Sequence, residues 1–380
     1  MWATAVLRRF FVKEHKLEVW LGNRLAGTMA ETGNHRFAFA YSDEWLKQGF
    51  AISPFSLPLE QKVFIPSGLA FQGLWGVFSD SLPDAWGRLL VDRMLQEKGF
   101  SPADVTPLER LAIVGSSGMG ALTYRPAWDS QRDTALSDLD ELSSKCSAIL
   151  NHEEVQDLDE VFRLGGSSGG ARPKVMTGEW IIKFPASGDR QDTGVMEKEY
   201  MDAAGACGII VPETKLMPSA NCGGFFAVRR FDRIGGQRAH MLSAAAILEA
   251  DWREPTLDYH TLMKLTSILS RGNEADLLQM YRRMCFNVFA HNRDDHAKNF
   301  SWIYDPKYDC WHPSPAYDLT WSTTYYGEHT TTVDGNGRDP GMKELLAVGK
   351  KAGLKSAVCN AVADEIQGKV QDLEKKWSRY

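Results

Sequence analysis

Side chains that could do chemistry are most concentrated at residues 291–301, which read His-Asn-Arg-Asp-Asp-His-Ala-Lys-Asn-Phe-Ser. Six of these eleven side chains are ionisable, and they directly follow the apolar segment 284–290. Burying an unpaired charge costs several kcal/mol, so such a cluster beside a buried segment is expected to have a function. Asp294, followed five residues later by Asn299, suits a loop that transfers a phosphoryl group.

In such a loop, Asp294 would be the catalytic base that accepts the proton of a substrate hydroxyl. Asn299 would bind a magnesium ion, and Lys298 would neutralise the charge that develops during transfer. The alternative is a metal-dependent hydrolase, since histidine and aspartate clusters also ligate zinc or manganese. Its ligands would be His291, Asp294, Asp295 and His296.

A second candidate is the stretch 165–170, Gly-Gly-Ser-Ser-Gly-Gly, which Lys174 follows. Glycines have no Cβ, so they let backbone N–H groups approach an anion closely. The stretch lacks the G-x-x-x-x-G-K-[ST] pattern of a P-loop, and alone it is a weak signal. We expect a strand on each side of it, at 161–164 and 175–176, as in a glycine-rich loop over a nucleotide.

The third candidate is Lys183, in an expected apolar strand at 180–184. A lone lysine in a strand usually extends to solvent at an edge, but here it could hold nucleotide phosphates. A carboxylate on the next helix would fix it, with Glu197 as first choice and Glu199 as the other. Asp318, about twenty residues after Asn299, fits a second carboxylate that binds metal.

These residues need elements to position them, and the first part of the chain, residues 1–127, is predicted to be an α+β domain. Alternating apolar residues at 16–39 predict a small antiparallel sheet. Helical spacing predicts two helices: 85–98, with Asp84 or Ser81 as its N-cap, and 107–114. An acidic connector, residues 128–160, follows, with a helix at 136–150. We expect a solvated face there, and an acidic surface for a basic partner is the alternative.

The remainder divides into a strand-rich part, residues 161–233, and a helix-rich part, residues 234–380. In the first, a helix at 195–207 and a strand at 225–231 follow the strand that carries Lys183. In the second, helices are predicted at 243–250, 259–270, 274–290 and 355–375, with two short strands at 302–304 and 310–311.

Composition sets limits on the class of protein. The 380 residues carry 43 Lys and Arg against 49 Asp and Glu, a net charge of -6, so bulk charge does not favour nucleic acid. The six cysteines form no C-x-x-C pair, which favours free thiols in a reducing compartment. The sequence shows no signal peptide and no apolar run long enough for a membrane span. We therefore expect a cytoplasmic protein without membrane contact.

Taken in order, these motifs resemble the HipA-type serine/threonine kinases, which are the toxins of bacterial HipBA toxin–antitoxin systems. The resemblance covers nearly the whole chain and includes Leu82-Pro83-Asp84, Arg230-Phe231-Asp232-Arg233 and Tyr317-Asp318. It implies an α+β fold with a two-lobed, protein-kinase-like core. An N-terminal α+β subdomain would precede the core, and the C-terminal lobe would be mostly helical.

The resemblance also implies a role for each candidate residue. ATP and Mg²⁺ would be the cofactors, with Asp294 as base and with Asn299 and Asp318 on magnesium. Lys183 would touch the phosphates, the loop at Gly169, Gly170, Ala171 and Lys174 would cover them, and backbone from Arg229 to Phe231 would bind adenine. The expected nucleotide site is completed by Glu197, His296, Lys298 and Tyr317.

In relatives, a serine of the loop is autophosphorylated and the loop is then ejected, which switches the kinase off. Ser167 is the matching position here, and Ser168 is the near alternative. The resemblance implies a protein substrate, by analogy an aminoacyl-tRNA synthetase, and a HipB-like helix-turn-helix antitoxin that would be the only link to DNA. Departures are Arg172-Pro173 and Arg229, where the best-known member has Gln-Glu and Glu. A binding module that holds such a repressor without turning over ATP is the second hypothesis.

Overall fold

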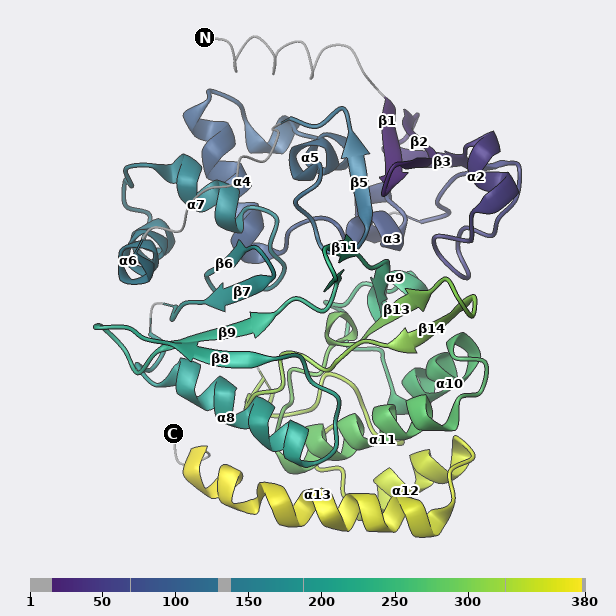
Figure 1. Cartoon of the computed structure of the whole chain (residues 1–380), viewed down its shortest axis with the longest axis vertical. Helices are drawn as coiled ribbons and strands as arrows, with labels where there is room; N and C mark the ends of the chain where they lie inside the picture. The colour runs from purple at the N-terminus through teal and green to yellow at the C-terminus, as the bar shows by residue number, and fades with distance from the viewer. Residues whose placement is uncertain (1–15, 69, 129–137, 187, 325, 378–380) are drawn as a thin grey trace.

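The computed structural model describes residues 16–68, 70–128, 138–186, 188–324 and 326–377 (Figure 1). Its first part contains a five-stranded antiparallel sheet in the order β4-β3-β2-β1-β5. The strands are β1 (Lys16–Leu21), β2 (Arg24–Thr32), β3 (Arg36–Tyr41), β4 (Val63–Phe64) and β5 (Leu122–Arg125). Val19 and Phe39, on β1 and β3, are fully buried. The predicted antiparallel sheet is therefore confirmed. The first fifteen residues, for which no signal peptide is predicted, lie outside the described residues.

The helices of this part are α2 (Asp43–Gln48), η1 (Ala70–Gly73), α3 (Gly76–Ser79), α4 (Ala85–Glu97), η2 (Pro102–Asp104) and α5 (Pro107–Val114). Both predicted helices are confirmed in α4 and α5. A capping box starts α5, because the Glu109 carboxylate accepts the Thr106 N–H at 2.7 Å and the Thr106 hydroxyl accepts the Glu109 N–H at 3.3 Å. Trp86, Leu90 and Met94 of α4 are buried at helical spacing.

Two helices follow: α6 (Leu139–Leu150) and α7 (Leu158–Gly165). Helix α6 confirms the predicted helix, whose first residues, 136–137, lie outside the described part. The strand predicted at 161–164 is wrong, because these residues belong to α7. Leu158, Val161 and Leu164 are buried at three-residue spacing, and a window of four residues is too short to reveal that helical period.

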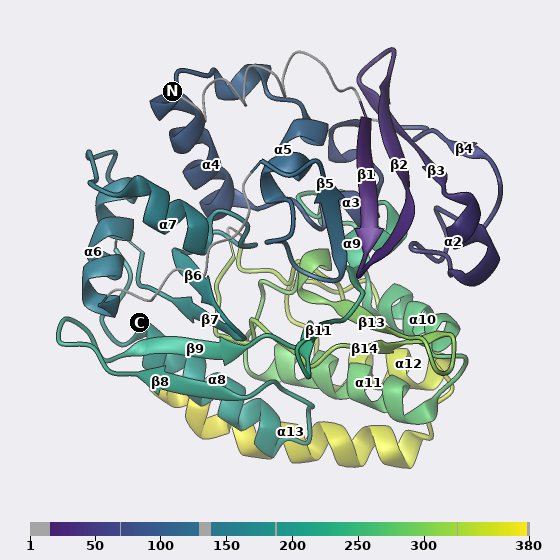
Figure 2. The same ribbon diagram turned by 45° about the horizontal axis from the view of Figure 1, so that its top comes forward.

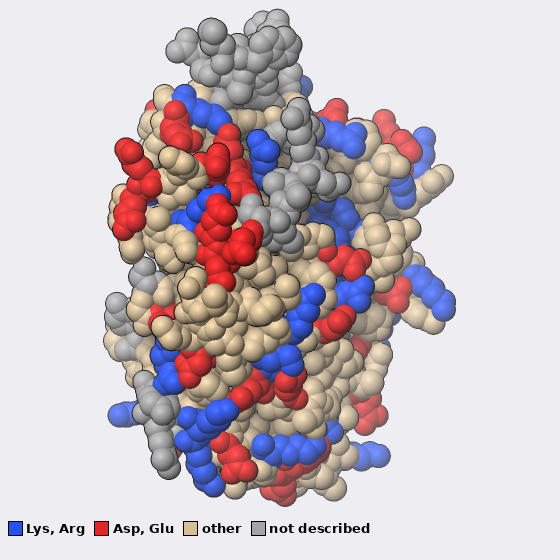
Figure 3. Space-filling view, turned by 60° about the vertical axis from the view of Figure 1, so that its left-hand side comes forward, with Lys and Arg blue, Asp and Glu red and all other residues tan. Residues whose placement is uncertain are grey.

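Acidic side chains gather over α6 and α7 on the upper half of the face in Figure 3, with basic side chains among them. Glu141, Glu153 and Asp159 are exposed there. Lys145 pairs with Glu141 and Glu160 at 2.9 Å each, so part of the negative charge is neutralised locally. This surface is a solvated, mixed-charge face, as the sequence predicts.

The central sheet is antiparallel and has the order β6-β7-β9-β8. Its strands are β6 (Lys174–Thr177), β7 (Trp180–Lys183), β8 (Thr214–Met217) and β9 (Phe225–Arg229). Successive residues face opposite sides of a strand. Ile182 and Ala227 accordingly pack with α4, α6 and α7, whereas Phe226 and Val228 join the main core with α8 (Thr193–Ala206). The sheet is thus covered by helices on both faces (Figure 1).

The helical lobe surrounds a three-stranded sheet in the order β12-β13-β14. Its strands, after the hairpin β10 (Arg233–Ile234) and β11 (Gln237–Arg238), are β12 (Met241–Ser243), β13 (Ser301–Asp305) and β14 (Cys310–Pro313). The helices are α9 (Ala244–Leu248), α10 (Tyr259–Leu269), α11 (Glu274–Phe289), η3 (Ala297–Asn299), α12 (Met342–Lys351) and α13 (Ser356–Trp377). All four helices predicted for this lobe are present, whereas α12 was not predicted. Helix α13 packs along α11 (Figure 2). Among the described residues, no helix is both long and apolar enough to cross a bilayer.

The first part of the chain is fastened to the helical lobe through α3 and α9. A Cβ on Gly76 would lie 2.5 Å from the Ala246 carbonyl oxygen, so this approach of two helices requires glycine. The Gly76 N–H donates to the Glu249 carboxylate at 2.9 Å. The Asp80 carboxylate accepts the N–H and the hydroxyl of Ser243 at 2.6 and 2.8 Å. These contacts hold the start of α4 close to the candidate site.

Candidate active site

A cleft of about 550 Å³ lies where the first part, the central sheet and the helical lobe meet. This volume is within the range of sites for small molecules. All of the residues predicted for the kinase site line it: Ser167, Ser168, Gly169, Gly170, Ala171, Lys174, Lys183, Glu197, Arg229, Phe231, Asp294, His296, Lys298, Asn299, Tyr317 and Asp318. The tertiary structure therefore brings together residues more than 150 positions apart, and their chemical roles remain predictions.

An ion-pair triad joins β7, α8 and the segment after β14. The Lys183 ammonium donates to Glu197 Oε1 and to Asp318 Oδ1. Burial alone would lower the pKa of Lys183, but Asp318 and Glu197 raise this pKa above its usual range, so the lysine is held charged. Glu197 is thus the partner, whereas Glu199 accepts a hydrogen bond from Lys376 at 2.7 Å. Glu197 and Tyr200 are three residues apart on α8 and are both buried, so they lie on the same, inward face of the helix. This spacing distinguishes Glu197 from Glu199.

Asp318 combines a strained backbone with a strongly ionised side chain. Its φ of +52° is left-handed, which costs a non-glycine residue about 1–3 kcal/mol and is common at functional sites. Burial raises the pKa of Asp318, but Lys183 and then Lys174 outweigh it and lower this pKa to about 2. The side chain is 41% exposed and lines the cleft, so an ionised carboxylate is presented to a ligand.

Two neighbouring aspartates have opposite environments in residues 291–300, here called the aspartate loop. Asp295 is fully buried and accepts hydrogen bonds from Tyr259 Oη, His329 Nδ1 and the Thr331 N–H, each at 3.0 Å. The side chain of Asp294 is 60% exposed and lines the cleft. Asp295 therefore anchors the loop, and Asp294 is the aspartate that can meet a substrate.

Backbone contacts fix the position of Asp294. Its N–H donates to Ser322 Oγ at 2.8 Å, and Asn299 Nδ2 donates to its carbonyl oxygen at 2.7 Å. Burial of the cleft wall raises the pKa of Asp294, while His296, whose Nε2 lies 3.9 Å from Asp294 Oδ1, opposes that rise. A raised pKa makes a carboxylate a better proton acceptor.

Asp84 is a site residue that the sequence reasoning missed. It stands at the N-cap position of α4 as predicted, but its side chain makes no cap hydrogen bond. Instead the carboxylate accepts hydrogen bonds from Lys298 Nζ and, at 3.0 Å, from the Gly170 N–H. Lys298 lowers the pKa of Asp84 despite burial. Asp84 thus ties the aspartate loop to the glycine-rich loop, and Leu82-Pro83-Asp84 was the sequence signal.

The glycine-rich loop lies folded into the cleft, with its serines covered. Ser167 is 6% exposed and donates to the Ser117 carbonyl at 3.1 Å, and Ser168 is 1% exposed and donates to the Gly165 carbonyl at 2.6 Å. Lys174 donates to the Gly169 carbonyl at 2.5 Å. Both serines are buried in this conformation, and each hydroxyl is held by a backbone carbonyl, so we expect a reaction at either one to require the loop to move.

The end of β9 forms the opposite wall of the cleft. Arg229 directs its side chain away to solvent, where it pairs with Glu179 at 2.5 Å. Phe231 stands 5.4 Å from the ring of Tyr317, measured between centroids. The neighbouring Asp232 is fully buried between Arg230 and Arg233 at 2.9 and 2.6 Å. The fully buried ion pair of Asp232 with Arg230 holds this turn in place.

The ligands of the alternative hydrolase do not converge. Asp295 is buried with Tyr259 and His329, Asp294 and His296 line the cleft, and His291 lines a different pocket. Across the described ranges, no three His, Cys, Asp or Glu side chains form a metal-binding group. The hydrolase interpretation of this cluster is therefore not supported by its geometry.

Asp318 and Asn299 do fit a magnesium ion that arrives with a nucleotide. Magnesium prefers oxygen ligands and keeps several from water and phosphate, so one carboxylate and one amide are enough. Asn299 donates through Nδ2 to the Asp294 carbonyl, which leaves Oδ1 as its possible ligand atom. The charged Lys183 and the glycine backbone supply complementary groups for phosphate oxygens.

Comparisons with known proteins agree with this arrangement. The model of the HipA N-terminal domain matches residues 17–125, and that of the HipA-like C-terminal domain matches residues 166–376. Two curated relatives come from Sinorhizobium fredii (strain NBRC 101917 / NGR234). Putative kinase Y4dM is 27% identical over 277 residues, which are 67% of this chain and 66% of that protein, just under two thirds of its length. Putative kinase Y4mE is 28% identical over 349 residues, which are 81% of this chain and 78% of that protein.

Among solved structures, HipA of Shewanella oneidensis MR-1, in a complex with HipB and operator DNA, has a similar fold. The TM-score is 0.72 at 19% identity, over 95% of this chain and 90% of that one. This likeness confirms the predicted α+β, kinase-like fold. Since the two domain models together match most of the sequence, the chain belongs to the HipA family.

Proposed function

We propose that this protein is an ATP- and Mg²⁺-dependent protein serine/threonine kinase of the HipA toxin type. One observation carries the proposal: the Lys183–Glu197–Asp318 triad lines the same cleft as Asp294 and Asn299. Kinases use a lysine, its glutamate partner, two magnesium-binding residues and an aspartate near the acceptor hydroxyl. The name putative kinase carried by both relatives points in the same direction.

The chain's residues would work mainly by positioning and by charge. Lys183, held by Glu197, would contact the nucleotide phosphates, and Asp318 and Asn299 would hold the magnesium ion, which neutralises phosphate charge. Asp294, fixed by Ser322, would orient the acceptor hydroxyl and take its proton. The backbone near Arg229 and Phe231 would receive adenine, and the glycine-rich loop would cover the phosphates.

The test is incorporation of labelled phosphate from ATP by the full-length protein, followed by mapping of modified residues. Asp294→Asn is expected to lower incorporation at least about 100-fold, because removal of a group aimed at the reacting atoms costs on that scale. Asp309→Asn is the control, since Asp309 is 69% exposed and pairs with Arg271. Equal incorporation by wild type and Asp294→Asn would refute the proposal.

We further propose that Ser167, or else Ser168, is the autophosphorylated residue, and that its phosphate switches the enzyme off. Two negative charges would enter a loop whose backbone faces nucleotide phosphates. The same mapping experiment locates this phosphate. The protein substrate is proposed to be a cytoplasmic protein such as an aminoacyl-tRNA synthetase, which phosphoproteomics after brief expression of wild type and Asp294→Asn would identify.

A second candidate function is to bind a HipB-like helix-turn-helix antitoxin, with DNA reached only through that partner. It is favoured by the fold shared with a HipA that was solved together with HipB and operator DNA. Kinase and antitoxin binding are compatible in one protein. A stabilising effect of nucleotide in thermal unfolding without any phosphotransfer would favour binding as the sole function.

A further inference from the structure

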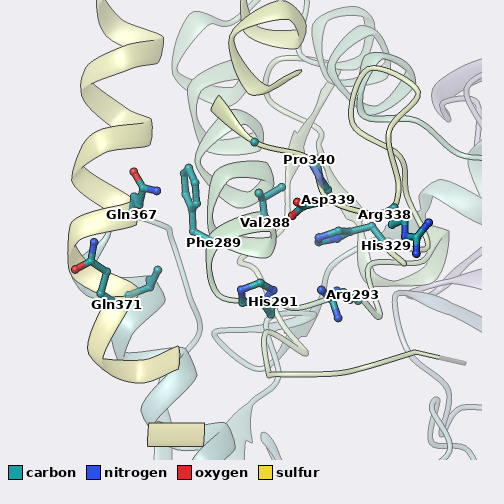
Figure 4. Close-up of a pocket in the computed structure, with 12 residues that line it drawn as sticks. Val288, Phe289, His291, Arg293, His329, Arg338, Asp339, Pro340, Gln367 and Gln371 are labelled. Carbon is teal, nitrogen blue, oxygen red and sulfur yellow. The ribbon is translucent and has the colours of Figure 1, made fainter. Parts of the chain in front are cut away.

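A second pocket lies behind the aspartate loop, between α11, α13 and the segment that precedes α12 (Figure 4). We call it the His/Arg pocket, and its volume is about 330 Å³. Arg293, His329 and Arg338 supply its basic wall, and Val288 and Phe289 supply its apolar wall. Figure 4 shows these side chains around one space, with two glutamines of α13 on the far side. Nothing in the proposed phosphotransfer uses this pocket.

Part of the basic wall has no acceptor within the described residues. Arg293 Nε is buried and has no hydrogen-bond partner within the described residues. Over the same residues, neither Arg293 nor Arg338 forms an ion pair with a carboxylate, although Asp339 also lines the pocket. A buried donor without an acceptor is unfavourable. An anionic ligand would supply the acceptor that Arg293 Nε lacks.

The other residues that line the pocket indicate which kind of anion would bind there. Guanidinium groups are planar and donate in pairs, which matches the several oxygens of a phosphate better than a single acceptor. Val288 and Phe289 offer a surface for a ring or another apolar group, and Gln367 and Gln371 can hydrogen-bond at its edge. The volume admits a small molecule and excludes a folded partner.

We infer that the His/Arg pocket binds a small phosphate monoester that carries a flat apolar group. Such a ligand would act directly on the aspartate loop. Arg293 precedes Asp294 in the chain, and His329 donates through Nδ1 to Asp295 at 3.0 Å. An occupant of the pocket would therefore contact Arg293, which adjoins Asp294 in the chain, and His329, which is hydrogen-bonded to Asp295. The inference that this pocket binds a phosphate monoester does not depend on the protein being a kinase.

Calorimetric titration of the full-length protein with phenyl phosphate tests the inference, because this probe joins a phosphate to a flat ring. Saturable binding is expected, weakened at least about tenfold by Arg338→Gln, which removes one charge-assisted donor pair. Arg338 is exposed on a loop, so this variant is expected to fold. Arg271→Gln, which alters an arginine 61% exposed and distant in sequence, is the matched control and should bind like wild type.

Lys183→Met separates this inference from the proposed kinase, because it disables the cleft and leaves the His/Arg pocket intact. Retained binding of phenyl phosphate in Lys183→Met, together with the loss in Arg338→Gln, supports the pocket even if no phosphotransfer is found. Binding that Arg338→Gln leaves unchanged, no saturation up to about 10 mM, or equal affinity for benzoate would each overturn the assignment.

Discussion

The cleft and the His/Arg pocket lie on either side of one loop and treat charge in opposite ways. In the cleft, Lys183 and Lys298 are each matched by carboxylates. In the His/Arg pocket, two guanidinium groups have none in the described part of the chain. A cleft with several carboxylates suits an anion that brings its own cation, such as a nucleotide with magnesium. Arginines without carboxylate partners suit an anion that comes alone.

The cleft and the His/Arg pocket are separated by a single loop. Asp294 lines the cleft, and Arg293 lines the pocket, so consecutive side chains of one loop serve different surfaces. Asp295 lies between them, buried, and receives the hydrogen bond of His329 from the pocket side. Asp295, which lines neither site, thus anchors the loop that separates the cleft from the His/Arg pocket.

Removal of this shared anchor should have the largest effect on stability. Asp295→Asn leaves one acceptor oxygen where three donors converge, so at least one buried donor loses its partner. We expect a loss of about 3 kcal/mol in the free energy of unfolding, measured by urea denaturation. Asp309→Asn should change it by less than about 0.5 kcal/mol. A loss no larger than the control's would show that Asp295 does not anchor the aspartate loop.

Lys174 gives the cleft a pH dependence. Burial, with Lys183 nearby, lowers the pKa of Lys174 to about 8 from an ordinary value near 10.5. Between these values the unfolded chain binds more protons than the folded one, so stability should rise with pH through this window. The expected gain, on the order of 2 kcal/mol, is read as the difference between wild type and Lys174→Met across the window. Parallel pH profiles for the two proteins would disprove the effect.

The smallest expected effect concerns the link between the two loops of the cleft. Asp84→Asn removes the charge that pairs with Lys298 but keeps an oxygen for the Gly170 N–H. Amide hydrogen exchange at residues 166–171 should become about fivefold faster, which corresponds to about 1 kcal/mol less protection. Glu97→Gln, at the exposed end of the same helix, is the control. Unchanged exchange in Asp84→Asn would mean that other contacts hold the loop.

Local pattern was enough to predict most elements. The sheet at 16–39, helices α4, α5, α8, α10, α11 and α13, and strands β6, β7 and β9 follow from periodicity and end signals that each segment carries by itself. Several short elements, among them α2, α3, β5 and β8, were not predicted, and two longer helices were missed for a local reason. Helix α7 was predicted as a strand because only four of its residues were considered, and α12 was overlooked, although its buried Leu345 and Val348 are spaced as in a helix.

The sequence by itself determined which residue types could act: an aspartate and an asparagine five apart, a lysine in a strand, and a glycine-rich loop before it. Only the tertiary structure decided their partners. Glu197 rather than Glu199 meets Lys183, because residues two apart on a helix point in nearly opposite directions and the packing of α8 selects one. Asp84 serves the cleft instead of its helix, and two arginines that have no carboxylate partner among the described residues share a pocket. Such encounters depend on how distant segments pack, so a local pattern can mark a candidate residue but does not name its partner.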